Sequence, residues 1–324
     1  MLYHRKLGAQ GPLVSALGLG CAGMSSGPAY QTPAAEEESS ATIAAALEQG
    51  ITLLNTGDFY GMGHNETTIG RVLRRRPESA FLSVKFGALR APSGEFLGLD
   101  CRPNSVKNFA AYSLQRLGVD VIDLYQPGRI DPAVPIEDTV GAVAELIAEG
   151  KVRFLGLSEV SSEQLRQAHE TYPVTAVEIE YSLANRSAEH GILTAARQLG
   201  CGVIAYNVVA QGLLTGLITG ELDADDNRRS LPRFQGVNLT SNLRVIDILR
   251  EFATARNATP AQVAIAWVLS RGEDVVPLVG MSRRSRLAEN LAATDLHLAD
   301  DELAFLDRTF GPGAIAGDRT NTRR

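Results

Sequence analysis

Short apolar runs recur along the chain and are separated by stretches with helical spacing. Eight of these runs have the length of one strand: 17–21, 51–54, 80–84, 121–125, 152–157, 174–179, 202–206 and 275–279. They lack the alternation of apolar and polar residues that marks a half-exposed strand, which favours parallel strands covered by helices. Strand then helix, repeated eight times, predicts an α/β fold that closes as a (β/α)8 TIM barrel.

The stretches between the runs carry helix signals. Apolar residues between positions 136 and 147 fall on one helical stripe. Ser161 with Gln164, and Thr259 with Gln262, have the spacing of a capping box, in which two side chains satisfy the free N–H groups of a helix start. These signals predict helices after the fifth strand and before the eighth.

A doubly wound open sheet is the competing architecture. It would carry a Gly-x-Gly-x-x-Gly turn after its first strand. Residues 18–23 have this spacing, but the glycines begin inside the strand predicted over 17–21, which is too early for such a turn. The barrel is therefore favoured, as one domain over residues 1–324.

Segments outside the repeat flank the barrel. Residues 3–7 and 13–16 predict an N-terminal β-hairpin that plugs the fold. Residues 223–229 form a charged insertion, for which we expect a mobile loop on the mouth side. Residues 300–308 predict a C-terminal helix, and the tail over 311–319 fits either disorder or a course across the barrel.

Composition limits the function classes. The chain is 44% hydrophobic and 21% charged, and it has no apolar run near the ~18 residues of a membrane span. A net charge of −6 argues against nucleic-acid binding. The cluster 74–76 of three arginines precedes Pro77 and fits a helix end, where cations are favourable.

The cysteines and the first residues bear on the compartment. Cys21, Cys101 and Cys201 lie too far apart for a zinc cluster or a disulfide framework, so no metal site is expected. The first residues lack the apolar region of a secretory signal. A reducing cytoplasm fits best.

Tyr60 and Lys85 are the candidate catalytic pair. Each follows an apolar run, where parallel strands deliver side chains to the mouth of a barrel. A nearby ammonium favours the phenolate, which lowers the pKa of the tyrosine and makes it a better proton donor to a developing alkoxide. Taken alone, either residue also fits a structural role.

The pattern resembles the aldo-keto reductases nearly from end to end. The resemblance is carried by the opening hairpin, residues 17–21, the Tyr60 turn, Lys85, and the segments 150–153, 156–159 and 286–290. It implies a barrel that binds NADPH at its C-terminal mouth. It also implies carbonyl reduction by an Asp-Tyr-Lys-His tetrad, in which Tyr60 and Lys85 match.

Two tetrad positions depart from the family. Asn55 stands at the Asp position and Gly128 at the His position, while Asp58 and His64 lie at the wrong spacing to replace them. Asn55 can orient Lys85 but supplies no charge, so we expect a less opposed positive field at Tyr60. A roomier site beside Gly128 is also expected. Asn55, a small residue at 128 and segment 176–180 are most similar to the pyridoxal reductase branch.

The resemblance also implies cofactor-binding residues. They are Ser158, Glu178, Tyr206, Gln211, Gly212, Leu214, Gly280, Ser282, Arg286, Glu289 and Asn290. Ser158 and Glu178 would meet the nicotinamide carboxamide, although Gln is more usual at 178, and Tyr206 would stack on the ring. Arg286, with Arg283 or Arg284, would favour NADP(H) over NAD(H). Trp267 and His297 are expected to be packing and surface residues.

Two functional hypotheses remain. The first is an NADPH-dependent reductase that converts an aldehyde or ketone, such as a pyridoxal-like compound, to the alcohol with Tyr60 as proton donor. The second, motivated by Asn55 and Gly128, is a regulatory or catalytically weak barrel that keeps the cofactor. The only partner expected in the first case, besides the cofactor, is a small-molecule carbonyl substrate.

Overall fold

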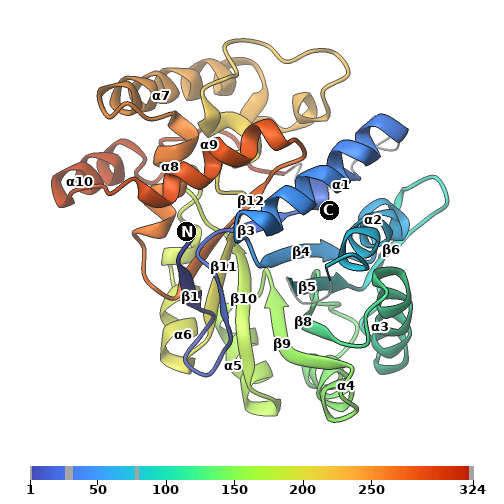
Figure 1. Cartoon of the computed structure of the whole chain (residues 1–324). Coiled ribbons are helices and arrows are strands. Elements are labelled where there is room, and N and C mark those ends of the chain that lie inside the picture. The colour runs from blue at the N-terminus through green and yellow to red at the C-terminus, as the bar shows by residue number, and fades with distance from the viewer. Residues whose placement is uncertain (1, 26–31, 77–79, 321–324) are drawn as a thin grey trace.

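Eight parallel strands close into a barrel in a computed structural model that describes residues 2–25, 32–76 and 80–320 (Figure 1). In chain order the barrel strands are β3 (Gly18–Gly20), β4 (Leu53–Gly57), β5 (Phe81–Phe86), β8 (Ile122–Pro127), β9 (Val152–Ser158), β10 (Val174–Glu180), β11 (Gly202–Tyr206) and β12 (Val275–Gly280). Strands β12 and β3 pair in parallel and complete the closure. The predicted barrel is confirmed.

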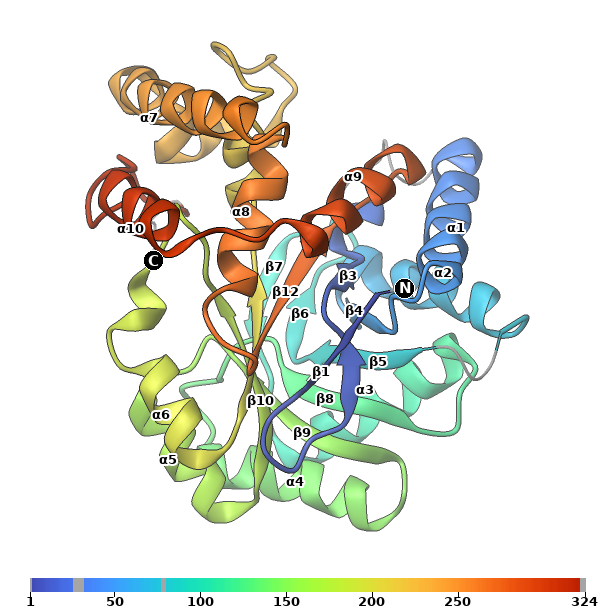
Figure 2. The same ribbon diagram turned by 60° about the vertical axis from the view of Figure 1, so that its left-hand side comes forward.

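Helices connect the barrel strands and surround them. They are α1 (Pro33–Glu48), α2 (His64–Leu73), α3 (Pro103–Leu117), α4 (Ile136–Ala148), α5 (Ser162–Thr171), α6 (Ile192–Leu199), α7 (Gly236–Ala255), α8 (Pro260–Leu269), α9 (Leu287–Ala292) and α10 (Asp300–Thr309). Both predicted capping boxes are present, at the starts of α5 and α8. Helices α7 and α10 are additions to the repeat and lie on the same side of the molecule (Figures 1 and 2).

The N-terminal hairpin closes one end of the barrel. Its strands, β1 (His4–Lys6) and β2 (Leu13–Ser15), pair antiparallel. Leu7 and Val14 are fully buried in a cluster with apolar side chains from inside the barrel. The guanidinium of Arg5 donates to the carbonyls of Leu269 (2.9 Å) and Val275 (2.6 Å), which fixes the hairpin against the start of β12. The hairpin therefore acts as the predicted plug.

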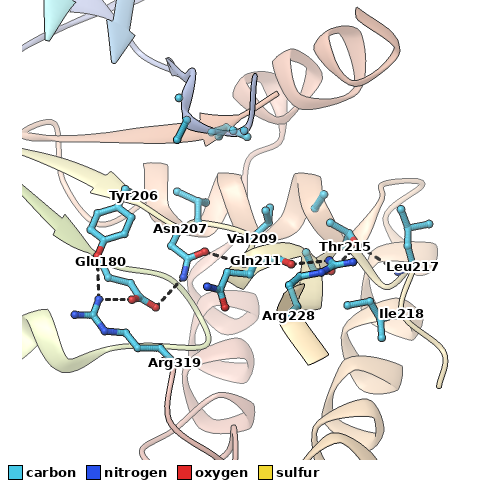
Figure 3. A pocket seen from close by; sticks show the side chains of 18 of the residues that line it. Glu180, Tyr206, Asn207, Val209, Gln211, Thr215, Leu217, Ile218, Arg228 and Arg319 are labelled. Carbon is cyan, nitrogen blue, oxygen red and sulfur yellow. Dashed lines mark hydrogen bonds and ion pairs between the residues drawn. The ribbon is translucent and has the colours of Figure 1, made fainter. Parts of the chain in front are cut away.

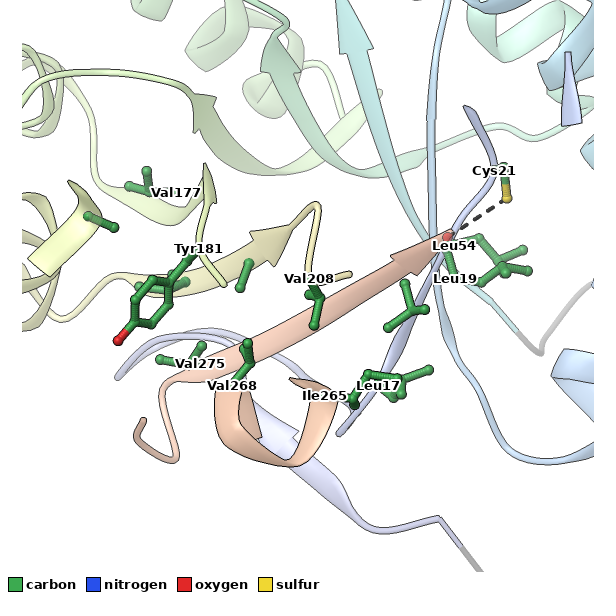
Figure 4. Close-up of a cluster of buried hydrophobic side chains, with 14 of the residues drawn as sticks. Leu17, Leu19, Cys21, Leu54, Val177, Tyr181, Val208, Ile265, Val268 and Val275 are labelled. Carbon is green, nitrogen blue, oxygen red and sulfur yellow. Dashed lines mark hydrogen bonds between the residues drawn. The ribbon is translucent and has the colours of Figure 1, made fainter. Parts of the chain in front are cut away.

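A second apolar layer lies between the barrel and its helices. Ile265 and Val268 of α8 belong to one buried cluster with Leu17 and Val275 (Figure 4). Trp267 is also fully buried, and its indole N–H donates to Asp307 Oδ1 (2.9 Å). Trp267 is thus a packing residue, as predicted.

The structure contains one hairpin that the sequence analysis did not predict, and it shows which of two expected courses the C-terminal tail takes. A second hairpin, β6 (Ala88–Arg90) with β7 (Phe96–Leu99), lies between β5 and α3 and was missed. The C-terminal tail folds across the barrel, and Asn242 of α7 exchanges two hydrogen bonds with Ala316 (2.9 and 2.7 Å). Of the two courses predicted for the tail, its described part takes the second.

The described ranges contain neither a candidate membrane span nor a metal cluster. There, no helix combines the length and apolarity that a membrane span requires. No group of three or more metal-ligating side chains comes together in the same part of the chain. All three cysteines are buried free thiols.

Candidate active site

A tight turn presents Tyr60 at the mouth of the barrel. Strand β4 ends at Gly57, and Gly61, Met62 and Gly63 take left-handed backbone angles with φ of 57°, 52° and 90° before α2 begins. Glycine adopts such angles without strain, which explains two of the three residues. The turn places the Tyr60 ring with its centroid 5.3 Å from the Nζ of Lys85. The predicted meeting of phenol and ammonium is present.

Lys85 lies in a buried polar network. Its Nζ donates to Glu178 Oε1 (2.9 Å) and to Asn55 Oδ1. Both Lys85 and Glu178 have side chains that are only 4% exposed. Gln126 Nε2 donates to Glu178 Oε2 (2.6 Å) and to Ser83 Oγ (3.1 Å). The ammonium is therefore paired with a carboxylate that comes from β10.

The orientation of the Asn55 amide follows from its partners. An ammonium only donates and a carboxylate only accepts. Asn55 therefore turns its oxygen to Lys85 and its Nδ2 to Glu178 Oε2 (2.7 Å), with a second bond to Ser83 Oγ (3.0 Å). The prediction that Asn55 orients Lys85 agrees with this geometry. The prediction of a less opposed positive field is wrong, because Glu178 supplies the charge.

Burial and charge shift the pKa values of the pair. Burial is the largest effect on the Tyr60 phenol and raises its pKa; the charge of Lys85 lowers this pKa without offsetting the rise, and Glu178 adds to the rise. Burial lowers the pKa of Lys85, but the attraction of Glu178 and then of Tyr60 outweighs it, so the pKa is raised. The expected net lowering of the Tyr60 pKa is therefore wrong. Both groups hold their protons more firmly than usual.

The space beside Gly128 is filled. The N–H of Gly128 donates to the carbonyl of Phe86 (2.8 Å), which fixes the backbone there. A Cβ at this position would lie 3.0 Å from the ring of Phe59. The roomier site expected beside Gly128 is not found, because this ring occupies it.

Asp58 and His64 do not line the pocket that contains Tyr60. The N–H of Asp58 donates to the carbonyl of Lys85 (2.9 Å), and burial raises the pKa of its carboxyl to about 7. His64 Nε2 lies 3.7 Å from Glu36. Neither residue replaces a missing tetrad position, in agreement with the spacing argument.

A pocket of about 930 Å³ opens above the network. Nine of the predicted site residues line it: Asn55, Tyr60, Glu178, Tyr206, Gln211, Gly212, Gly280, Arg286 and Asn290. The other predicted residues do not line the pocket: Lys85, which is buried, and Ser158, Ser282 and Glu289. The side chain of Leu214 packs in the hydrophobic core and is not part of the lining, so its expected part in cofactor binding stays a prediction.

The C-terminal tail contributes a charged cluster to one wall. Arg319 donates to Glu180 and to the hydroxyl of Tyr206 (3.0 Å) (Figure 3). It also donates to Glu159. Asn207 donates to Glu180 Oε1 (3.0 Å) and accepts from the N–H of Gln211 (2.7 Å). These contacts fix Tyr206 and the loop after it at the pocket.

Comparisons with known proteins agree with this geometry. The model of the aldo/keto reductase family matches residues 16–309. The chain belongs to this family. It is 37% identical over 316 residues to "Probable aldo-keto reductase 1" of Glycine max, covering 97% of this chain and 90% of the relative. Aldo-keto reductases are oxidoreductases that reduce carbonyl compounds and generally use NAD(P)H.

Solved structures show the same likeness. A glycerol dehydrogenase from Gluconobacter oxydans superposes with a TM-score of 0.85 at 28% identity, covering 99% of this chain and 98% of that one. A thermostable aldo-keto reductase in complex with the inhibitor epalrestat gives 0.76 at 26% identity, with coverage of 95% and 100%. The likeness thus extends over nearly all of the aldo-keto reductase barrel.

The pocket of this aldo-keto reductase fits a dinucleotide on two observations. Ser158 is buried beside Glu178 in the β9–β10 pairing, and its Oγ has no hydrogen-bond partner among the described residues. Such a buried hydroxyl can serve a polar group of a ligand. At the other end of the site, Arg286 is a half-exposed guanidinium in the pocket lining. A carboxamide suits the end of the site at Ser158, and a phosphate suits the end at Arg286.

Several site residues were missed in the sequence. Gln126 stands one position after the strand predicted over 121–125 and lies on β8 in the structure, where it pairs in register with Lys85. Glu180 shares its strand face with Glu178, since the two are two residues apart. Arg319 lies in a tail whose composition carries no signal of its place in the fold.

Proposed function

We propose that the chain is an NADPH-dependent reductase of an aldehyde or ketone, with Tyr60 as the proton donor. The observation that carries the proposal is the position of Tyr60. It lines a large pocket, and the centroid of its ring lies 5.3 Å from the buried Nζ of Lys85. A phenol there can give its proton to a carbonyl oxygen as negative charge develops on it. The product is the alcohol.

The side chains divide the work of this reaction. When bound, NADPH supplies the hydride for the carbonyl carbon. Tyr60 stays protonated at neutral pH because burial raises its pKa, so its proton is available to the substrate oxygen. Lys85 stabilises the phenolate that remains, because its buried ammonium lies close to the ring.

Four groups would hold the cofactor. Ser158 Oγ and one free lone pair of Glu178 Oε1 would meet the carboxamide, since Lys85 is the only protein donor to that oxygen in the described chain. Tyr206, fixed by Arg319, would stack on the nicotinamide. Arg286 would pair with the 2′-phosphate, which favours NADPH over NADH.

Pyridoxal-like aldehydes remain the proposed substrates, with one change in the reason. The filled space beside Gly128 offers no room for a substrate hydroxyl. A polar substituent must therefore bind on the open side of the pocket, which Arg129 also lines.

The three free thiols suit a reducing compartment, and we propose the cytoplasm.

The test is a panel of aldehydes and ketones mixed with the protein and NADPH, followed by the absorbance of the reduced cofactor. We expect turnover with at least one aldehyde, and its loss in Tyr60→Phe. NADPH binding without turnover of any carbonyl would instead support the regulatory or catalytically weak barrel. Absence of both binding and turnover would contradict the proposal entirely.

A further inference from the structure

We propose that Glu178 is the carboxylate that positions Lys85 for catalysis, and that the residues at positions 55 and 178 depend on each other. One of the two strands supplies the carboxylate and the other supplies an amide, an arrangement that we call the exchange of charge. This inference rests on the proposed reductase function and adds a positioning residue to it. The resemblance noted in the sequence implies Asp at position 55 and Gln at position 178. The present chain has the amide at 55 and the carboxylate at 178.

The exchange preserves the chemistry because all the groups meet at one point. Asn55 comes from β4, Lys85 from β5, Gln126 from β8 and Glu178 from β10. Strands β4 and β10 are not neighbours in the barrel, so their side chains meet across its interior. One carboxylate placed on either strand can therefore serve the same ammonium.

The two positions also constrain each other. Asn55 Nδ2 donates to Glu178 Oε2 at 2.7 Å, so an Asp at 55 would place a second carboxylate at hydrogen-bond distance from the first. Two buried carboxylates this close repel, and one of them must take up a proton. An amide at both positions would leave Lys85 as a buried charge without a counter-charge. Only one carboxylate with one amide satisfies the site.

The charge of Glu178 also fixes the direction of the pH effect. It raises the pKa of both Lys85 and Tyr60. Replacing it by an amide removes that contribution, so both groups lose their protons at lower pH than in the unmutated protein. Because the reaction needs both protons, the alkaline limb of the activity profile must move to lower pH.

The experiment is a double-mutant cycle with Glu178→Gln, Asn55→Asp and the double variant. We expect each single change to lower the rate of hydride transfer, measured in single turnover at saturating NADPH, by at least about tenfold. The double variant should recover most of that rate. In Glu178→Gln the alkaline limb should move to lower pH, and in the double variant it should return. The proposal would be overturned if the rate loss in the double variant equalled the product of the two single losses. It would also be overturned if the alkaline limb of Glu178→Gln did not move.

A second readout separates this proposal from the reductase function. The urea midpoint of unfolding should fall in each single variant and recover in the double variant, since a buried charge is left without its balance only in the singles. This recovery needs no turnover. If the protein reduced no carbonyl compound, the reductase proposal would fail, while recovery or additive loss of the midpoint would still decide the exchange of charge.

An independent observation concerns Arg129, from which we infer that the pocket takes carbonyl substrates with an anionic group. Arg129 follows Gly128 after β8 and lines the pocket together with Tyr60. Its Nη1 donates to the carbonyl of Gly128 (2.6 Å), and no carboxylate of the described residues forms an ion pair with it. The guanidinium is exposed, so it can reach a substrate.

The nearby carboxylates do not compete for this guanidinium. Glu159 and Glu180 both pair with Arg319 on the same wall. Arginine presents a planar set of N–H donors that matches a carboxylate or a phosphate. A substrate with such a group near its carbonyl would therefore be held at Arg129 while its oxygen meets Tyr60. The inference names a substrate class and also rests on the reductase function.

Two matched pairs of aldehydes test the class and separate its two chemical sources. They are 4-carboxybenzaldehyde against benzaldehyde for a carboxylate, and pyridoxal 5′-phosphate against pyridoxal for a phosphate. In the unmutated protein we expect a higher kcat/KM for the charged member of at least one pair. Arg129→Met should lower that ratio about tenfold or more, the value of one charge-assisted contact. Arg166→Met, on the outer face at α5, is the control and should leave the ratio unchanged.

The pair that responds identifies the anion. A ratio near one in both pairs, or a ratio that Arg129→Met does not change, would overturn the inference. Calorimetric binding of 4-carboxybenzoate, compared between the unmutated protein and Arg129→Met, gives a readout without turnover. Weaker binding to the variant supports the anion site even if no carbonyl is reduced, whereas equal binding contradicts it.

Discussion

The ring of Phe59 lies against Gly128, where a Cβ would come within 3.0 Å of it. The same ring atoms, Cε1 and Cζ, lie 3.3 Å from a Cβ that would be added to Gly57. Phe59 thus packs closely against two glycines, and its ring also packs edge-on against Tyr60, with 4.9 Å between centroids. The small residue at position 128 therefore makes room for a ring that supports the proposed proton donor.

Gly128→Ala should destabilise the protein and disturb Tyr60. The added methyl group has to displace the Phe59 ring, and such overpacking costs about 1–3 kcal/mol. Urea unfolding measures the loss, and a lower kcat would show that the displaced ring carries Tyr60 with it. Gly141→Ala is the matched control, because a Cβ there meets nothing within 4 Å and the site lies inside α4. A variant at 128 as stable as the unmutated protein would show that the ring yields freely.

Tyr60→Phe should remove most carbonyl reduction and leave NADPH binding nearly intact. The hydroxyl is the proposed proton source, and loss of a general acid costs roughly 10²–10⁴ in rate. The main cofactor contacts proposed here lie on other strands. Steady-state rates and a fluorescence titration with NADPH measure the two effects. Turnover near the unmutated rate would assign the proton to another group, and His64 is a poor candidate because it does not line the pocket.

The barrel was predictable because its signals are local. Each strand is a short apolar run and the capping boxes start α5 and α8. The hairpin β6–β7 was missed because its strands are short and partly exposed, so they carry no buried run. Local signals also located the Tyr60 turn and Lys85.

The balance of charge in the site was not predictable from spacing. Asn55 and Glu178 are 123 residues apart, and their hydrogen bond depends on how the closed barrel brings β4 and β10 to one point. The same holds for Phe59, whose ring fills space beside Gly128 only once β4 and β8 are both in place. The resemblance identified the positions, but only the packed structure shows which residue compensates for which.

Asp58 should make the protein less stable as the pH rises. Burial and the nearby charge of Glu66 raise its pKa from 3.8 to about 7 in the folded state. The folded state therefore binds this proton more tightly than the unfolded chain. The resulting stability is fully present below the unfolded pKa and is lost as pH rises through about 7. The full effect is on the order of 4 kcal/mol at most.

Asp58→Asn removes this titration and should flatten the dependence of unfolding free energy on pH. Urea unfolding between about pH 4 and about pH 7 measures the slope, since this carboxyl contributes none above its folded pKa. Asp100 is the control of opposite sign, because its hydrogen bonds with Arg102 hold its pKa below the usual value, so Asp100→Asn should not flatten that slope. An unchanged slope in Asp58→Asn would mean that the carboxyl is already ionised in the folded protein at neutral pH.

Arg286→Ala should narrow the preference for NADPH over NADH. Arg286 lines the pocket with a side chain that is 44% exposed, and its nearest acid, Glu289, lies 3.6 Å away. Its guanidinium can therefore turn to a 2′-phosphate. Arg284 is already engaged, since its backbone N–H and its Nη2 each donate to Glu38 of α1 at 2.8 Å. Both further arginines predicted to assist are exposed, and Arg283 is the better placed because Arg284 already pairs with Glu38.

A charge-assisted hydrogen bond is worth about 1.5–3 kcal/mol, so the ratio of the two dissociation constants should shift by roughly tenfold to a hundredfold in Arg286→Ala. The loss of affinity should fall on NADPH, because NADH has no 2′-phosphate for Arg286 to bind. Arg284→Ala serves as the control: it breaks the contact with α1 but should leave the ratio nearly unchanged. Fluorescence titration with both cofactors gives the two dissociation constants needed for each protein. Equal affinity of the unmutated protein for NADPH and NADH would contradict the assignment of Arg286, and an equal response of the two variants would mean that the loop position, and not the guanidinium, sets the preference.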